Sequence, residues 1–185
     1  MIGVEALLRW NDPEFGMVAP STFIPIAEES GLILQIGEWV LDAACRQVHR
    51  WQEQGLPRFP VSVNLSAVQF RQRGLEQVVA DALKGSGIEA SCLELEVTET
   101  SIMHDISEVR GTLDRLKAFG VTLSVDDFGT GYSSLGYLKR LPLDRLKIDR
   151  SFVKDVTEDA DDAAITAAIV AMARTLGLKL SLIHI

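Results

Sequence analysis

Leu93-Glu94-Leu95-Glu96-Val97-Thr98-Glu99 is the stretch that decides the fold class, because it alternates apolar and polar side chains. Successive side chains of a strand point to opposite faces, so Glu94, Glu96 and Thr98 share one face and the leucines share the other. Strands that helices cover on both faces usually read as continuous apolar runs. A strand with an acidic face therefore needs a reason for keeping its carboxylates.

The same alternation recurs along the chain, in segments that are separated by helical patterns. The expected strands are Gly3–Trp10, Val61–Ser66, Leu93–Thr98, Val121–Asp127, Arg145–Asp149 and a strand that begins at Leu178. The expected helices are Pro20–Glu29, Gly37–Gln54, Leu75–Leu83, Ser107–Phe119 and Asp161–Leu176. Alternating strands and helices predict a parallel sheet in an α/β fold. We expect a (β/α)8 TIM-type barrel, incomplete at about six βα units because a full barrel takes about 250 residues.

Composition excludes several classes of partner. The chain has 185 residues, with 18 Lys and Arg against 26 Asp and Glu, and a net charge of −8. An acidic chain binds DNA or RNA polymers poorly, because that binding depends on basic side chains. No apolar run can span a bilayer and no signal peptide is recognisable, so we expect no membrane contact from this segment. The 2 cysteines are too few for a disulfide framework, which favours a reduced, cytoplasmic location.

The polar faces of the expected strands would point to the barrel axis. Carboxylates buried together cost many kcal/mol unless cations offset their charge. The oxygen ligands available on these faces come from Glu5, Asn64, Glu96, Asp126 and Asp127. Oxygen ligands favour Mg²⁺, Mn²⁺ or Ca²⁺ over Zn²⁺, and Arg9 and Lys147 would add positive charge. The alternative is a set of antiparallel strands whose polar sides face water.

Five motifs resemble the EAL-domain family of bacterial phosphodiesterases, which cleave cyclic di-GMP to linear pGpG. They are Glu5-Ala6-Leu7-Leu8-Arg9-Trp10, Asn64-Leu65-Ser66, Glu94-Leu95-Glu96-Val97-Thr98-Glu99, Asp126-Asp127-Phe128-Gly129-Thr130-Gly131-Tyr132-Ser133-Ser134 and Lys147-Ile148-Asp149. The resemblance runs from about residue 2 to residue 179. It implies that residues 1–180 are a partial EAL domain with cyclic di-GMP as ligand, and a homodimer is a further expectation.

The resemblance also implies roles for single residues. Two Mg²⁺ or Mn²⁺ ions would be held by Glu5, Asn64, Glu96, Asp126 and Asp127, with Asp126 shared between them. A substrate contact would come from Arg9, and catalytic roles would fall to Lys147, Asp127 and Glu99. Leu8 and Asp149 are further expected substrate contacts, with a structural pairing of Asp149 with Lys147 or Arg9 as the alternative. Lys147 resembles the lysine beside the attacking water, and Glu99 resembles the glutamate that anchors the loop Asp127–Ser134. Two ions about 4 Å apart can activate water and stabilise charge on a phosphoryl group.

The last residues depart from the family pattern. After Lys179 the family continues with Ala-Glu-Gly-Val-Glu, whose first glutamate joins the metal site, whereas Ile183 stands near that place here. The segment Leu180–Ile185 reads as one translation frame of a transposon end sequence used in DNA library preparation. We therefore expect residues 181–185 to be a non-native tail, with an ordinary apolar strand as the alternative. We expect the domain to be truncated at both ends, and this polypeptide to have very low activity.

Two other functions stay open. A degenerate EAL domain would bind cyclic di-GMP or a partner protein without cleavage, although the intact motif residues argue against it. An enolase-like site would use acids on barrel strands and a lysine to abstract a proton beside a carboxylate. That chemistry gives Asn64 no role as a ligand.

Overall fold

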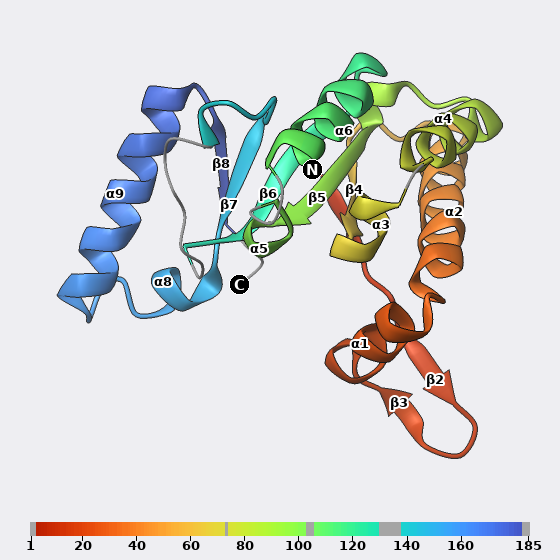
Figure 1. Ribbon diagram of the computed structural model, residues 1–185, viewed down its shortest axis with the longest axis horizontal. Helices are drawn as coiled ribbons and strands as arrows, with labels where there is room; N and C mark the ends of the chain where they lie inside the picture. The colour runs from red at the N-terminus through yellow and green to blue at the C-terminus, as the bar shows by residue number, and fades with distance from the viewer. Residues whose placement is uncertain (1–2, 73, 103–105, 130–137, 183–185) are drawn as a thin grey trace. The chain divides into compact units, whose positions relative to one another are not determined.

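The computed structural model describes residues 3–72, 74–102, 106–129 and 138–182 (Figure 1). The chain divides into two compact units, Met1–Glu94 and Leu95–Ile185. Each unit combines parallel strands with helices, as the sequence predicts for an α/β fold. No helix in the described ranges is long and apolar enough to cross a membrane.

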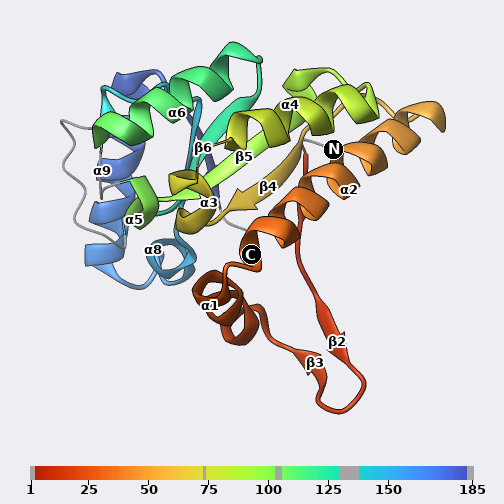
Figure 2. The same cartoon turned by 45° about the vertical axis from the view of Figure 1, so that its right-hand side comes forward.

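The first unit is built on two parallel strands and a pair of long helices. β1 (Val4–Ala6) pairs in parallel with β4 (Val61–Leu65), with Glu5 opposite Ser62. The helical segments of this unit are α1 (Pro20–Ser30), α2 (Ile33–Glu53), α3 (Ala67–Arg71), α4 (Leu75–Ser86) and the 3₁₀ helix η1 (Ala90–Cys92). α2 runs alongside α4 in Figures 1 and 2, and Leu41, Cys45 and Val79 are fully buried.

An antiparallel hairpin follows β1, made of β2 (Trp10–Asp12) and β3 (Gly16–Val18). The single strand expected over Gly3–Trp10 is therefore wrong beyond Ala6. The turn is closed by Asp12, whose Oδ1 accepts hydrogen bonds from the backbone N–H groups of Glu14 and Phe15 at 2.9 and 3.1 Å. An aspartate that bonds the backbone two residues on is a common turn signal, and here it ends the alternating pattern.

The second unit contains a row of parallel strands. Its strands, in the order in which they neighbour one another, are β5 (Leu93–Thr98), β6 (Thr122–Phe128), β7 (Arg145–Ile148) and β8 (Lys179–Leu182), and β5 begins in the last two residues of the first unit. Its helices are α5 (Glu99–Ile102), α6 (Ile106–Ala118), α8 (Arg150–Lys154) and α9 (Ala160–Leu176). α9 packs along β7 and β8 (Figure 1). The expected positions of these strands and of the two long helices are confirmed to within about two residues, the usual uncertainty of element ends.

The strand with alternating leucines and glutamates, β5, is buried on both faces. Leu93, Leu95 and Val97 are fully buried, and Glu94 and Glu96 are only 2% and 0% exposed. The acidic face of β5 therefore lies in the protein interior and not against water, which contradicts the alternative of a solvated polar face for this strand. Its carboxylates must be compensated by other charged or polar groups.

The C-terminal strand includes part of the expected tail. Ser181 and Leu182 belong to β8 and stand opposite Lys147 and Ile148 of β7. Residues 183–185 lie outside the described residues, and they include Ile183, which stands near the position of the family's metal-site glutamate. The origin of this tail stays a prediction, because a parallel strand forms here whether or not the residues are native.

Candidate active site

A buried cluster of charged side chains joins three strands of the second unit. Lys147 Nζ on β7 lies 2.6 Å from Glu96 Oε1 on β5 and 3.9 Å from Asp126 Oδ2 on β6. The Glu96 side chain is 0% exposed, and those of Lys147 and Asp126 are 11% and 13% exposed. Two carboxylates around one ammonium leave an excess of negative charge in a site that water reaches poorly. A divalent cation would offset that charge.

Strand register explains why these side chains meet. Val125 of β6 stands opposite Leu146 of β7, so the next residues, Asp126 and Lys147, are neighbours in the sheet. The register shifts between Val125 and Phe128, and irregular strand ends of this kind often lie next to functional sites. All three charged residues lie in the C-terminal half of their strands, the end that carries the chemistry in barrels of this class.

The end of β6 has an unusual backbone. Asp127 has a φ of 53°, in the left-handed region that residues other than glycine seldom adopt. Its N–H donates to Asp126 Oδ1 at 3.1 Å, and its carboxyl hydrogen-bonds to the carboxyl of Asp149. Desolvation raises the pKa of Asp127, and the charges of Asp126 and Asp149 raise it further. The Ser151 hydroxyl lowers the pKa of Asp149, so Asp127 is the more basic carboxyl of this pair.

Glu99 holds the segment that follows Asp127. This carboxylate is 1% exposed, and its Oε2 accepts a hydrogen bond from the Gly129 N–H at 2.9 Å. A charge-assisted bond to a buried carboxylate is stronger than a bond between neutral groups. The role expected for Glu99, anchoring the loop Asp127–Ser134, stays a prediction, because residues 130–137 lie outside the described residues.

The two predicted ligands of the first unit are hydrogen-bonded to each other. Asn64 Nδ2, on β4, donates a hydrogen bond to Glu5 Oε1, on β1, at 2.8 Å. Both side chains are exposed, and they lie on neighbouring parallel strands. Because the amide nitrogen is used by Glu5, the Oδ1 atom of Asn64 is the one available to a metal ion. The pair therefore presents oxygen atoms only.

Two of the three residues predicted to contact substrate, Leu8 and Arg9, line a pocket in the first unit, whereas Asp149 is not part of its lining. Leu8 and Arg9 bound a space of about 390 Å³ whose other walls are apolar side chains of β2, α1 and α2. Arg9 is exposed, and its Nη1 donates to the Leu8 carbonyl at 2.7 Å. The Trp10 ring packs edge-to-face on Phe23 with centroids 5.8 Å apart. The pocket combines one guanidinium with flat apolar surfaces, which suits a ligand with both phosphates and aromatic bases.

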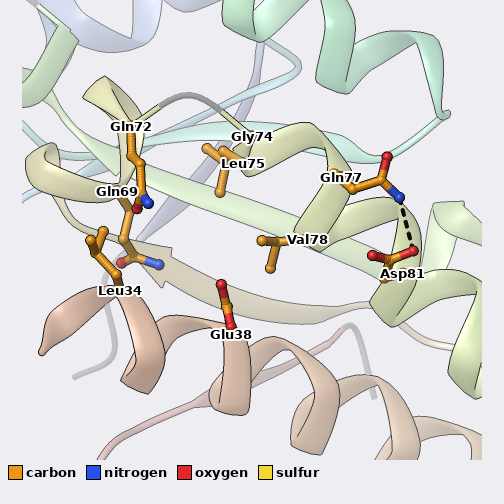
Figure 3. A pocket seen from close by; sticks show the side chains of 9 residues that line it. All are labelled: Leu34, Glu38, Gln69, Gln72, Gly74, Leu75, Gln77, Val78 and Asp81. Atoms are coloured by element: carbon orange, nitrogen blue, oxygen red, sulfur yellow. Dashed lines mark hydrogen bonds between the residues drawn. The ribbon is translucent and has the colours of Figure 1, made fainter.

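A second hollow, of about 310 Å³, lies among α2, α3 and α4 (Figure 3). Its polar lining residues are Glu38, Gln69, Gln72, Gln77 and Asp81. Gln77 Nε2 donates to Asp81, and Gln69 Oε1 accepts from the Ser66 N–H in the capping box of α3. None of the predicted site residues lines this hollow, and Gln69 has a structural task there.

The donor atoms fit hard divalent ions. Carboxylate and amide oxygens are the ligands that Mg²⁺ and Mn²⁺ prefer, and the buried excess of negative charge beside Lys147 would be offset by such ions. Within the part of the chain that the structure describes, no three His, Cys, Asp or Glu side chains already converge as a metal site. The ammonium of Lys147 instead lies against both Glu96 and Asp126.

Comparison with known proteins gives the family. The chain matches the EAL domain family over residues 1–185. It is 55% identical to the bifunctional diguanylate cyclase/cyclic di-GMP phosphodiesterase MucR of Pseudomonas aeruginosa. This match extends over 180 residues and covers 97% of this chain and 26% of MucR. The chain is 47% identical over 176 residues to the cyclic di-GMP phosphodiesterase NbdA of the same species, which covers 95% of this chain and 22% of that protein. The chain thus spans about a quarter of these relatives.

A solved structure agrees with these matches. The structure described as the PaMucR phosphodiesterase in complex with c-di-GMP superposes with a TM-score of 0.94 at 54% identity, over 98% of this chain and 74% of that chain. EAL domains are TIM-type barrels, so the expected fold class is confirmed. Sequence reasoning missed Ser151, which the N-cap pattern Asp149-Arg150-Ser151 could have indicated. The chain belongs to the EAL domain family.

Proposed function

We propose that this chain is a phosphodiesterase domain that hydrolyses cyclic di-GMP to linear pGpG. Membership of the EAL family and the names of the relatives support the reaction. The observation that carries the proposal is the buried group of Glu96, Lys147 and Asp126, with the Lys147 ammonium 2.6 Å from Glu96. A strand that only supported the fold would gain more from apolar side chains, since a buried ion pair is seldom favourable for stability.

We propose that the pocket beside β1 binds the dinucleotide. The guanidinium of Arg9 would pair with a phosphate oxygen, because arginine presents several donors to such oxygens. The apolar walls, with Leu8 and Trp10 among them, would accept a guanine ring. Asp149 would add a contact at the second unit, where its backbone already ties α8 to the end of β6. A chain of net charge −8 binds a dianionic ligand only with help from cations.

We propose that two Mg²⁺ or Mn²⁺ ions are held by Glu5, Asn64, Glu96, Asp126 and Asp127. Such ions supply Lewis acidity and lower the pKa of bound water. The oxygen donors named here, and the acidic excess around Lys147, support this assignment. Burial and the charges of Asp126 and Asp149 raise the pKa of Asp127, and a cation held at this carboxylate would offset that unfavourable charge.

The chain's own residues would then orient the reactants. Lys147 would direct the attacking water and attract the phosphate, since its ammonium is a compact point charge held by Glu96. The water oxygen forms the new bond to phosphorus, the bond from phosphorus to O3′ breaks, and O3′ takes up a proton. The phosphate stays on the 5′ side, which gives pGpG. Glu99 would keep the end of β6 in place through the Gly129 N–H.

Product analysis tests the proposal. We expect the 185-residue chain to form pGpG from cyclic di-GMP with Mn²⁺ or Mg²⁺ at the very low rate of a truncated domain, and to form none with EDTA, as measured by liquid chromatography and mass spectrometry. Glu96→Gln should lower the rate about 100-fold or more, since the lost charge stabilisation amounts to several kcal/mol. The exposed Glu53→Gln is the matched control and should change nothing.

The outcomes separate the proposed enzyme from its alternative. Binding of cyclic di-GMP without pGpG at any metal concentration would favour the non-catalytic binding module. Neither binding nor cleavage would contradict the proposal altogether. The homodimer stays a prediction, and sedimentation equilibrium of the chain with and without cyclic di-GMP can check it.

A further inference from the structure

The end of β6 lies against the aromatic ring of Phe152, which has no role in the proposed catalysis. Gly129 follows directly after the strand and has a φ of +104°. A Cβ atom on Gly129 would lie 2.7 Å from Cε2 of Phe152, a distance that real Cβ atoms essentially never show. The Phe152 ring therefore occupies the space that any side chain at position 129 would need. Only glycine accepts both this φ and this approach.

The ring is held in place by its own helix and by the next one. Phe152 lies in α8, the helix that Asp149 caps, and its N–H donates to the Asp149 carbonyl at 3.2 Å. Its carbonyl accepts from Thr166 Oγ1 of α9 at 2.9 Å. Ile169 of α9 is buried and would lie 3.4 Å from the same added Cβ atom. The position of the ring is therefore set by α8 and α9 together.

Gly129 is thus held from two sides. Glu99 of α5 binds its N–H at 2.9 Å, and the Phe152 ring of α8 packs against its backbone. Asp127 stands two residues earlier with a φ of 53°. A residue in that region persists only where its surroundings hold it. A glycine next to it, with its wide range of backbone angles, would otherwise let the strand end relax.

We propose that Phe152 is a positioning residue, which fixes the end of β6 at Gly129 and thereby the carboxyl of Asp127. The link to Asp127 rests on the proposed function, whereas the effect on Gly129 does not. Phe152 touches neither ions nor nucleotide in this account. It acts by excluding other backbone conformations at the Asp127–Gly129 segment.

Amide hydrogen exchange of the metal-free chain tests the first part. Phe152→Ala should speed exchange of the Gly129 N–H about tenfold or more, because local opening frees it from Glu99. Phe152→Leu, which keeps apolar bulk, should give a smaller increase. The internal control is the Leu123 N–H on the same strand, bonded to Asp144 Oδ2 at 2.8 Å, which should keep its rate. Phe59→Ala, which removes a buried ring packed on Trp51, is the matched variant and should leave Gly129 unchanged.

Manganese affinity tests the second part. Phe152→Ala should weaken Mn²⁺ binding about tenfold, the lower end of the loss seen when a supporting group of a metal site is removed, and Phe59→Ala should not. Unchanged exchange at Gly129 would overturn the proposal, and so would equal acceleration at Gly129 and Leu123, which indicates lost stability alone. If Phe152→Ala does not fold, Phe152→Leu replaces it, and exchange of the Gly129 N–H at the wild-type rate in that variant would overturn the proposal. Faster exchange with unchanged Mn²⁺ affinity would overturn the link to Asp127, and a wild-type chain that binds no Mn²⁺ would refute the proposed function instead.

Discussion

Replacement of Lys147 by methionine should destabilise the metal-free fold by several kcal/mol. Methionine fills a similar volume and removes only the ammonium. The Glu96 side chain, which is 0% exposed, would then lose the cation that lies 2.6 Å away. A buried carboxylate without its partner is among the most costly defects in a protein interior.

The structure gives the magnitude. At an effective dielectric constant of about 20, a unit charge pair at 2.6 Å attracts by about 6 kcal/mol and one at 3.9 Å by about 4 kcal/mol. Desolvation of the lysine, which the variant no longer suffers, offsets much of this attraction. Removal of one partner of a buried pair costs about 3–5 kcal/mol in measured cases, and we expect about 3 kcal/mol for Lys147→Met.

A double-mutant cycle isolates this interaction. Urea unfolding of the wild type, Lys147→Met, Glu96→Gln and the double variant, all with EDTA, gives four free energies of unfolding. The double variant should be more stable than Lys147→Met alone, because neutral Gln no longer needs the ammonium, with a coupling of about 2 kcal/mol or more. The Lys154→Met variant, whose side chain is 66% exposed, is the control and should change stability little. Effects that add to within about 0.5 kcal/mol would show that Lys147 and Glu96 do not stabilise each other.

Three further variants probe the structure around the site. Gly129→Ala should lower the free energy of unfolding by about 2 kcal/mol or more, because of the φ of +104° and the Phe152 ring. Gly85→Ala, with open space around it in α4, should be neutral or stabilising by up to about 1 kcal/mol. Thermal unfolding of both variants measures this difference, and equal effects would contradict it. Asp144→Ala should cost about 1–3 kcal/mol in urea unfolding, because the Leu123 N–H and Lys117 lose their acceptor, and a wild-type midpoint would disprove that role. Burial raises the pKa of the Cys45 thiol to about 11. Stability should therefore fall as the pH rises from about 9 through 11, because the thiol ionises in the unfolded chain and not in the folded one, and Cys45→Ala should remove this loss. Identical alkaline unfolding curves for the two proteins would exclude this contribution of Cys45.

Local patterns predicted the regular part of the fold. Alternation along β4, β5 and β6, and helical spacing in α2 and α9, depend on residues close in sequence, so periodicity reads them directly. The β2–β3 hairpin was missed because the Trp10 side chain continues the alternation of β1, while the Asp12 turn breaks it two residues later. The short helices α3, α5 and α8 span 5, 4 and 5 residues, too few for a period to be recognised.

The site was predictable in its chemistry and not in its contacts. The types of side chain on successive strands indicated oxygen ligands and one lysine. The order of contacts, with Lys147 closer to Glu96 than to Asp126, depends on strand register and on the shift after Val125. The packing of Phe152 on Gly129 joins segments that are distant in sequence and carries no periodic signal. Such contacts follow only from tertiary structure.

Electron paramagnetic resonance of added Mn²⁺ shows whether the acidic side chains hold two ions. We predict saturable uptake of two ions by the wild-type chain in the presence of cyclic di-GMP, and a loss of at least one of them in Asp126→Asn. The exposed Asp114→Asn, whose carboxylate lies 3.5 Å from Arg110, should bind as the wild type does. Equal Mn²⁺ binding by the Asp126→Asn and wild-type chains, or no saturable binding by either, would contradict the account.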